Sequence, residues 1–244
     1  MDWIKMFSET EKLFDDIFSL TKEESYKKSQ VIELFALTSL SICRENLGAI
    51  NLLLQNNFYY EIFMIFRHQI ELMFRLNWIM NATTDEEREE RVNNIEADSY
   101  RKYDVELDEL KKMKEKKYFT ENTISNAKEF IKEIKQNNSQ LIEDNKFMGC
   151  GKNIEMAGEL REKYYHQFKF LSMLSHPNPS SREYFLTTNK GEDVFEESFE
   201  NSCTYAMKVF KENLNKIINL LGQNLKKNDE IKELQSLFND IAGE

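Results

Sequence analysis

Apolar residues recur every three or four positions along most of this chain, with short polar breaks between the repeats. This spacing places apolar side chains along one face of an α-helix, whereas a half-buried strand alternates every second position. The pattern therefore predicts successive helices joined by short turns. The expected helices span residues 2–19, 23–54, 58–80, 84–117, 121–145, 154–175, 193–225 and 229–241.

Polar residues mark the expected helix boundaries. Thr21 with Glu24, and Thr84 with Glu87, have the Thr-x-x-Glu spacing of a capping box. In that motif each of the two side chains accepts a backbone N–H at the helix N-terminus. Residues 55–57, Gln-Asn-Asn, form the expected turn between the second and third helices.

The composition agrees with an all-α fold. Only 7 Gly and 2 Pro are present, and a sheet protein needs many more of these residues for its turns. We predict an all-α, single-domain bundle of long antiparallel helices over residues 1–244. The charged segment 84–147 is expected to form a peripheral helical hairpin within it. The expected core residues are Leu34, Leu37, Ile50, Leu53, Phe63, Phe66, Ile70, Phe74, Phe168, Leu171, Phe210, Ile217 and Leu221.

Charge and hydropathy narrow the function classes. The net charge of −10 argues against a general basic surface for nucleic acid and leaves a local basic pocket open. No run reaches 18 uncharged apolar residues, and the N-terminus lacks the basic start of a signal peptide, so we expect a cytoplasmic protein without a membrane span. Cys43, Cys150 and Cys203 are far apart in sequence and are expected to be reduced thiols.

The helix predicted over 58–80 holds the first candidate site. It is apolar enough to be buried, yet its ionisable residues fall within an arc of roughly 120°. These residues are Glu61, Arg67, His68, Glu71 and Arg75. Charges on an otherwise buried helix must face water or find partners. Arg67 and Glu71, four residues apart, are expected either to form an ion pair that fixes packing or to serve a ligand.

The helix predicted over 154–175 holds the second candidate. Polar residues recur on one side of it at spacings of three and four. They are Arg161, Tyr165, Lys169, Ser172 and His176. His176 precedes Pro177, where it is either a capping residue at the helix C-terminus or a general acid–base group. Ser172, one turn earlier, is placed to hydrogen-bond it.

Arg161 and His166 form an alternative pair with Arg-x4-His spacing. Five residues turn a helix through about 500°, which leaves the two side chains about 140° apart. They converge within one chain only if the helix begins between them.

No cofactor or metal is expected. The three Cys and three His are scattered, and His68 with Glu71 is the only close pair of metal-ligand type. The Gly149–Lys152 segment lacks the first glycine and the Ser/Thr of a phosphate-binding loop.

On the Arg67-x3-Glu71 helix and the Tyr165-x6-Ser172-x3-His176 element, the chain resembles a bacterial all-helical family of unknown function. More distantly it is similar to the HEPN superfamily. The matching pieces cover about a third of the chain. In the family of unknown function, the characteristic arginine and histidine correspond to Arg67 and His176.

The HEPN resemblance implies a helical bundle, often dimeric, of a kind frequent in toxin–antitoxin and phage-defence systems. Many such proteins are metal-independent ribonucleases with an Arg-x4–6-His motif at a dimer cleft. In this sequence that motif corresponds to Arg161 and His166, and the polar residue that usually follows the arginine is present as Glu162. The chain departs from the nuclease pattern, because the characteristic residues of the closer family of unknown function correspond to Arg67 and His176 instead.

Two mechanisms compete at these residues. In the enzyme hypothesis, His176 or His166 takes a proton from a ribose 2′-hydroxyl and an arginine stabilises the pentacoordinate phosphate. The site is then Arg67, Glu71, Ser172 and His176 in a metal-independent endoribonuclease, with RNA and a second copy of the chain as partners. In the alternative, the same four residues form a satisfied polar cluster within a bundle that binds a partner protein or senses a small ligand.

Overall fold

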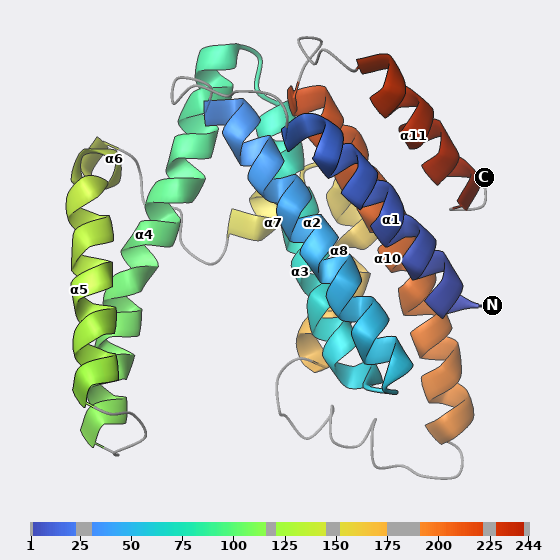
Figure 1. Ribbon diagram of the computed structural model, residues 1–244, viewed down its shortest axis with the longest axis horizontal. Helices are drawn as coiled ribbons and strands as arrows, with labels where there is room; N and C mark the ends of the chain where they lie inside the picture. The colour runs from blue at the N-terminus through green and yellow to red at the C-terminus, as the bar shows by residue number, and fades with distance from the viewer. Residues whose placement is uncertain are drawn as a thin grey trace. The chain divides into compact units, whose positions relative to one another are not determined.

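The computed structural model describes residues 2–22, 31–115, 121–144, 152–174, 191–221 and 228–241. These residues form ten helices and no strand, which confirms the predicted all-α bundle (Figure 1). The helices are α1 (Trp3–Lys22), α2 (Val31–Gln55), α3 (Tyr59–Met80), α4 (Asp85–Glu115), α5 (Glu121–Asn137), α6 (Ser139–Asp144), α7 (Lys152–Ala157), α8 (Leu160–Leu174), α10 (Gly191–Leu221) and α11 (Asn228–Ile241).

The chain divides into two compact units. One consists of residues 82–152, and the other of residues 1–81 together with 153–244. In the first unit, 82–152, α4 packs along α5 and α6, and Val92, Ile95 and Ile131 are buried. Arg101 of α4 donates to the carbonyl of Ile142 in α6. The hairpin expected over 84–147 has nearly the bounds of this unit, and the single domain over 1–244 stays a prediction.

The other unit is built around the antiparallel pair α2 and α3. Three residues join the two helices, and Asn57 adopts a left-handed φ of 59°, which asparagine tolerates better than most residues. α1 and α10 also pack on α2, while α3 contacts α8 and α10, so α3 is covered on several sides (Figure 1). This unit therefore contains both helices that carry the candidate residues.

Aromatic residues fill the core of this unit. Phe7 stacks on Phe66 with 6.0 Å between ring centroids, and Phe14 meets Phe210 edge-on at 6.1 Å. Nine of the expected core residues are buried: Ile50, Phe63, Phe66, Ile70, Phe74, Leu171, Phe210, Ile217 and Leu221.

The core prediction was wrong for Leu34, which is 37% exposed. The buried stripe of α2 runs through Ala36, Leu40 and Cys43, and a residue two positions before Ala36 points to the other side of the helix. Leu37, Leu53 and Phe168 are half-buried at the margin of the core.

Helix starts follow the sequence signals only in part. The amide of Glu87 donates to Thr84 Oγ1 at 3.2 Å, as expected for an N-cap, but the Glu87 carboxylate accepts from Thr83 instead of Thr84. Thr21 lies inside α1, where its hydroxyl donates to the Phe18 carbonyl, so it does not cap a following helix. Glu24 lies outside the described residues.

The helix predicted over 154–175 is broken in two. α7 ends at Ala157, and Gly158 takes a φ of +51°, which only glycine adopts without strain. Buried Asn77 of α3 holds this break, since its amide donates to the Ala157 carbonyl and its oxygen accepts from Lys216 Nζ, both at 3.2 Å. α8 therefore starts at Leu160, a position fixed by contacts with α3.

Candidate functional site at α3 and α8

Arg67 and Glu71 form an ion pair on α3, with Nη2 and Oε1 3.1 Å apart. The two side chains are 30% and 18% exposed, so the pair lies at the edge of the core and not within it. Arg67 also places its guanidinium carbon 5.7 Å from the ring centroid of Phe168 on α8. Two contacts, one electrostatic and one cation–π, therefore fix the orientation of this guanidinium.

A pocket of about 380 Å³ opens beside this ion pair. The described residues that line it all come from α3: Met64, Ile65, Arg67, His68 and Glu71. Met64 is 49% exposed, which is unusual for a large apolar side chain next to charged groups. Apolar walls with a few convergent polar groups are typical of small-ligand and active sites.

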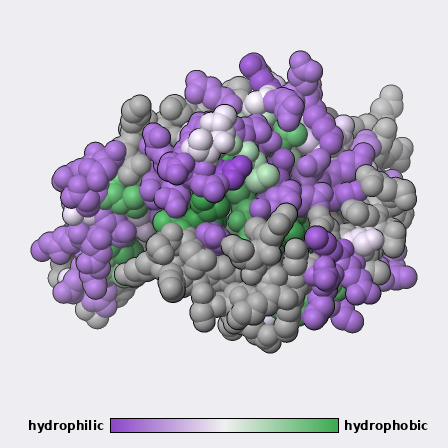
Figure 2. Space-filling model, turned by 90° about the horizontal axis from the view of Figure 1, so that it is seen from above, coloured by the Kyte–Doolittle hydropathy of each residue, from purple (hydrophilic) through white to green (hydrophobic). Residues whose placement is uncertain are grey.

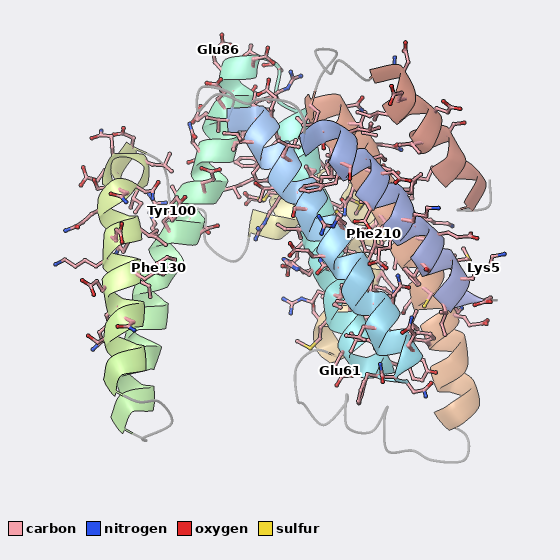
Figure 3. The ribbon with its side chains drawn as sticks, in the orientation of Figure 1. Lys5, Glu61, Glu86, Tyr100, Phe130 and Phe210 are labelled. Carbon is pink, nitrogen blue, oxygen red and sulfur yellow. The ribbon has the colours of Figure 1, made fainter. Side chains whose placement is uncertain are left out.

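The polar arc predicted for this helix forms as expected from its spacing. Glu61 and His68 are exposed, and Arg67, Glu71 and Arg75 are half-buried. Glu61 lies near the N-terminal end of α3, away from the pocket lining (Figure 3). The pocket therefore occupies the middle of the arc.

Ser172 lies on α8, one turn after Phe168. Its hydroxyl oxygen is shielded from solvent. Residues four apart lie on the same face of a helix, so Ser172 is on the same face of α8 as Phe168, the ring that Arg67 covers. The structure thus joins Arg67 to Glu71 and to Phe168 of α8, and Ser172 shares the helix face of Phe168. His176 lies outside the described residues, and its meeting with Arg67 stays a prediction.

The alternative pair is not brought together within one chain. α8 begins before Arg161, so Arg161 and His166 both lie in regular helix, about 140° apart around its axis. Both side chains are exposed. They reach a common site only if a second molecule supplies one of them.

Other parts of α8 tie it to α10. Gln167 donates to Ser202 Oγ at 3.1 Å, and Lys163 Nζ lies 3.5 Å from Glu212 Oε1. Tyr164 is fully buried between these contacts, and its burial raises the pKa of the phenol. Tyr164, together with the Glu212 carboxylate, raises the pKa of Lys163. α8 is therefore held on one side by α10 and on the other by α3.

The two described thiols take no part in this site. Cys43 and Cys203 are free and buried, and burial raises the pKa of both thiols, which makes them poor nucleophiles. Cys150 lies outside the described residues. Within the described ranges, no three His, Cys, Asp or Glu side chains gather as metal ligands. In the same ranges, every helix is too short or too polar to cross a membrane.

Sequence reasoning missed Phe168, Met64 and Ile65 as parts of the site. Phe168 was assigned to the core, and its half-buried ring is instead the platform for Arg67. A signal existed in the spacing, since Phe168 lies three residues after Tyr165 and four before Ser172, on the candidate face itself. Met64 and Ile65 carry no such signal, because apolar residues surround them in the sequence.

The sequence profile of a family of unknown function (DUF5677) matches residues 33–193. No curated protein and no solved structure matches the chain. The matched range covers about two thirds of the sequence and contains both α3 and α8, the helices that form the candidate site. The chain therefore belongs to the family of unknown function (DUF5677).

Proposed function

We propose that this protein is a metal-independent endoribonuclease, distantly HEPN-like, of a bacterial defence or toxin–antitoxin system. The observation that carries the proposal is the setting of Arg67. Its guanidinium is oriented by Glu71 and Phe168 and borders an open pocket with an exposed apolar wall. A fixed guanidinium at a pocket suits recognition of a phosphate group.

In the proposed reaction, His176 accepts the proton of a ribose 2′-hydroxyl, and the 2′-oxygen attacks the adjacent phosphorus. Arg67 stabilises the negative charge that develops on the pentacoordinate phosphate. The bond to the 5′-oxygen breaks, the leaving oxygen takes up a proton, and the products are a 2′,3′-cyclic phosphate and a 5′-hydroxyl. Glu71 orients Arg67, and Ser172 orients the imidazole.

A homodimer gives the second histidine a role. Arg161 and His166 are both exposed on α8 and lie on different faces of it. At the interface of a two-fold symmetric dimer, a contact between one residue of the first copy and another residue of the second is repeated with the copies exchanged. We propose that Arg161 of one protomer and His166 of its partner approach each other in this way.

A second candidate function is a non-enzymatic bundle that binds a partner protein. The observation in its favour is that Arg67 and Glu71 satisfy each other within one helix, in a chain with a net charge of −10. In this hypothesis the ion pair specifies how the helices pack.

The buried polar residues weigh against that second hypothesis. Asn213 Nδ2 donates to the backbone oxygen and to Oε1 of Gln69, both at 3.1 Å, and the Cys43 thiol donates to the same Oε1 at 3.2 Å. This cluster is fully buried where α2, α3 and α10 meet. It joins three helices and is placed to fix their register, whereas the partly exposed Arg67–Glu71 pair lies within one helix.

The test is RNA cleavage in the presence of EDTA. Wild type, His176→Ala and His166→Ala are incubated with total bacterial RNA, and the new ends are mapped. We expect discrete cuts by wild type and their loss in His176→Ala. Loss in His166→Ala alone would move the catalytic role to the dimer pair. Absence of cuts by the folded wild type would contradict the ribonuclease proposal and favour the binding bundle.

A further inference from the structure

On α8, the ring of Tyr165 lies between two cationic side chains, those of Arg161 and Lys169. These three residues are here named the α8 cation stripe. Arg161 Cζ lies 5.5 Å from the ring centroid of Tyr165, and Lys169 Nζ lies 5.4 Å from the same centroid. The three residues are spaced by four and therefore share one face of the helix. Arg161 and Lys169 are exposed, and Tyr165 is half-buried.

The charge of the stripe is not neutralised by nearby carboxylates. Among the described residues, neither Arg161 nor Lys169 forms an ion pair, whereas Lys163, on the α10 side of the same helix, pairs with Glu212. α8 carries three cations and one carboxylate, Glu162, in a chain whose net charge is −10. Most of the coloured surface in Figure 2 is hydrophilic, and over the whole sequence the 43 acidic residues outnumber the 33 basic ones. The stripe is thus a local basic surface on an acidic protein.

The stripe leads to the candidate site. Tyr165 lies three residues before Phe168, so the two aromatic rings occupy neighbouring positions on α8. Phe168 carries the Arg67 guanidinium on its other side and also contacts Phe74 of α3, with 5.8 Å between ring centroids. Arg161, Tyr165 and Lys169 therefore lie on the part of α8 next to Phe168, the residue that Arg67 contacts. A polyanion on the stripe would have one part of its backbone beside Arg67.

We infer that the α8 cation stripe is the binding surface for a single-stranded RNA whose backbone continues into the Arg67 pocket, an inference that rests on the proposed ribonuclease function. Arg161 and Lys169 contact successive parts of the phosphate backbone, and an unpaired base stacks on Tyr165. Cations interleaved with an aromatic ring are the chemistry with which proteins hold single strands without reading their sequence. The stripe thus selects unpaired RNA.

Binding is tested by fluorescence anisotropy with a labelled 2′-O-methyl oligouridine of about 12 nucleotides, a length within the usual range for single-strand sites. The methyl group blocks attack by the 2′-oxygen, so binding is measured without cleavage. The variants are R161E/K169E, Tyr165→Leu and Tyr165→Phe. The matched control is K5E/K12E, which reverses two exposed lysines on α1 and changes the net charge equally. Lys5 lies in the first turn of α1, and its side chain projects into solvent (Figure 3).

We expect R161E/K169E to weaken binding by at least about tenfold and to lower the slope of log K against log salt by about 1.4, the value for two lost phosphate contacts. Tyr165→Leu should weaken binding by about tenfold, and Tyr165→Phe should bind like wild type, since the ring is kept. K5E/K12E should retain the wild-type salt slope. Thermal unfolding of each variant verifies that these exposed substitutions leave the fold intact.

Three results would overturn the inference: equal weakening by R161E/K169E and K5E/K12E, unchanged binding by R161E/K169E, or no RNA binding by wild type. Failure of the proposed function has a different signature. RNA that binds the stripe but is not cut would refute the nuclease and retain the binding surface. RNA that is cut as efficiently by R161E/K169E as by wild type would refute the binding surface and retain the nuclease.

Discussion

Two arginines of this protein make the same kinds of contact in two different settings. Arg67 of α3 pairs with Glu71 at 3.1 Å and lies over Phe168. Arg44 of α2 pairs with Asp15 at 2.9 Å and lies over Phe18, with 4.9 Å from its guanidinium carbon to the ring centroid. The Arg67 side chain is 30% exposed and that of Arg44 is 36% exposed. By local contacts alone, the two arginines are almost equivalent.

Their surroundings differ. Arg67 borders a pocket with an exposed methionine, and the Phe168 ring that it covers is on the same helix as the α8 cation stripe. Arg44 of α2 is joined to α1 by its ion pair with Asp15. Asp16 and Glu45, the residues that follow Asp15 and Arg44 in the sequence, add two further carboxylates. An arginine among several carboxylates stabilises a helix contact, whereas an arginine at the edge of an open pocket is available to a phosphate. The comparison separates a structural contact from a candidate site.

The largest expected difference between the two arginines is in catalysis. Arg67→Ala should reduce the rate of RNA cleavage by about 100-fold or more, the usual effect of removing a group that stabilises a transition-state charge. Arg44→Ala should cleave RNA at nearly the wild-type rate. Cleavage of one labelled RNA in EDTA measures both. Equal losses in the two variants would show that Arg67 acts only through stability.

The aromatic rings under the two arginines provide a second, smaller contrast. Phe168→Leu keeps an apolar side chain of similar size but removes the cation–π contact that orients Arg67. We expect about a tenfold loss of kcat, since misplacement of a catalytic group is costly. Phe18→Leu, which removes the ring under Arg44, should leave kcat unchanged. Kinetics of the two variants side by side test this, and unchanged kcat in Phe168→Leu would contradict it.

Two glycines extend the comparison to the backbone of each region. Gly158→Ala forces a residue with a Cβ into a φ of +51°, which should lower the free energy of unfolding by about 1–2 kcal/mol. The added Cβ itself meets Asn77 Nδ2 at an ordinary 3.5 Å, so the cost is conformational. Because this turn positions α8, cleavage should fall as well.

Gly48→Ala is the matched control near Arg44. Its Cβ would meet only the flexible end of Glu11, at 2.8 Å, and a helical alanine gains about 1 kcal/mol over glycine. The net change in unfolding free energy should be close to zero. Urea unfolding of both variants measures the two changes, and an equal destabilisation would refute the assigned role of the Gly158 turn.

The smallest expected effect is the energy of the ion pairs themselves. A double-mutant cycle on Arg67 and Glu71, and another on Arg44 and Asp15, should each give a coupling of about 0.3–1 kcal/mol in unfolding free energy. Both couplings should shrink with added salt. A coupling several times larger for Arg67 and Glu71 would support the alternative in which that pair serves helix packing.

The fold was largely predictable because its signals are local. The apolar spacing gave the helix over 58–80 within one residue of α3, and the Asn56-Asn57 turn before it forms as expected. The break at Gly158 was missed, since a single glycine within a periodic segment is also tolerated inside a helix. What fixes the break is Asn77, which is 80 residues away from Ala157 in sequence and carries no sign of this contact.

The site was predictable where it depends on spacing within one helix. The i,i+4 rule anticipated the Arg67–Glu71 contact and the common face of Tyr165 and Lys169. It could not supply the placement of the Phe168 ring under Arg67, because that contact joins two helices. Contacts between helices depend on packing over the whole bundle, and one sequence gives no direct signal of them.

The most direct test of the ribonuclease site compares two RNAs that differ by one oxygen. After the cut position is mapped, the same RNA is prepared with a single 2′-deoxynucleotide at that position, and both are incubated with wild type in EDTA. The account predicts that the all-ribose RNA is cut to a 2′,3′-cyclic phosphate and that the 2′-deoxy RNA stays intact. Cutting of both RNAs, or of neither, would contradict it.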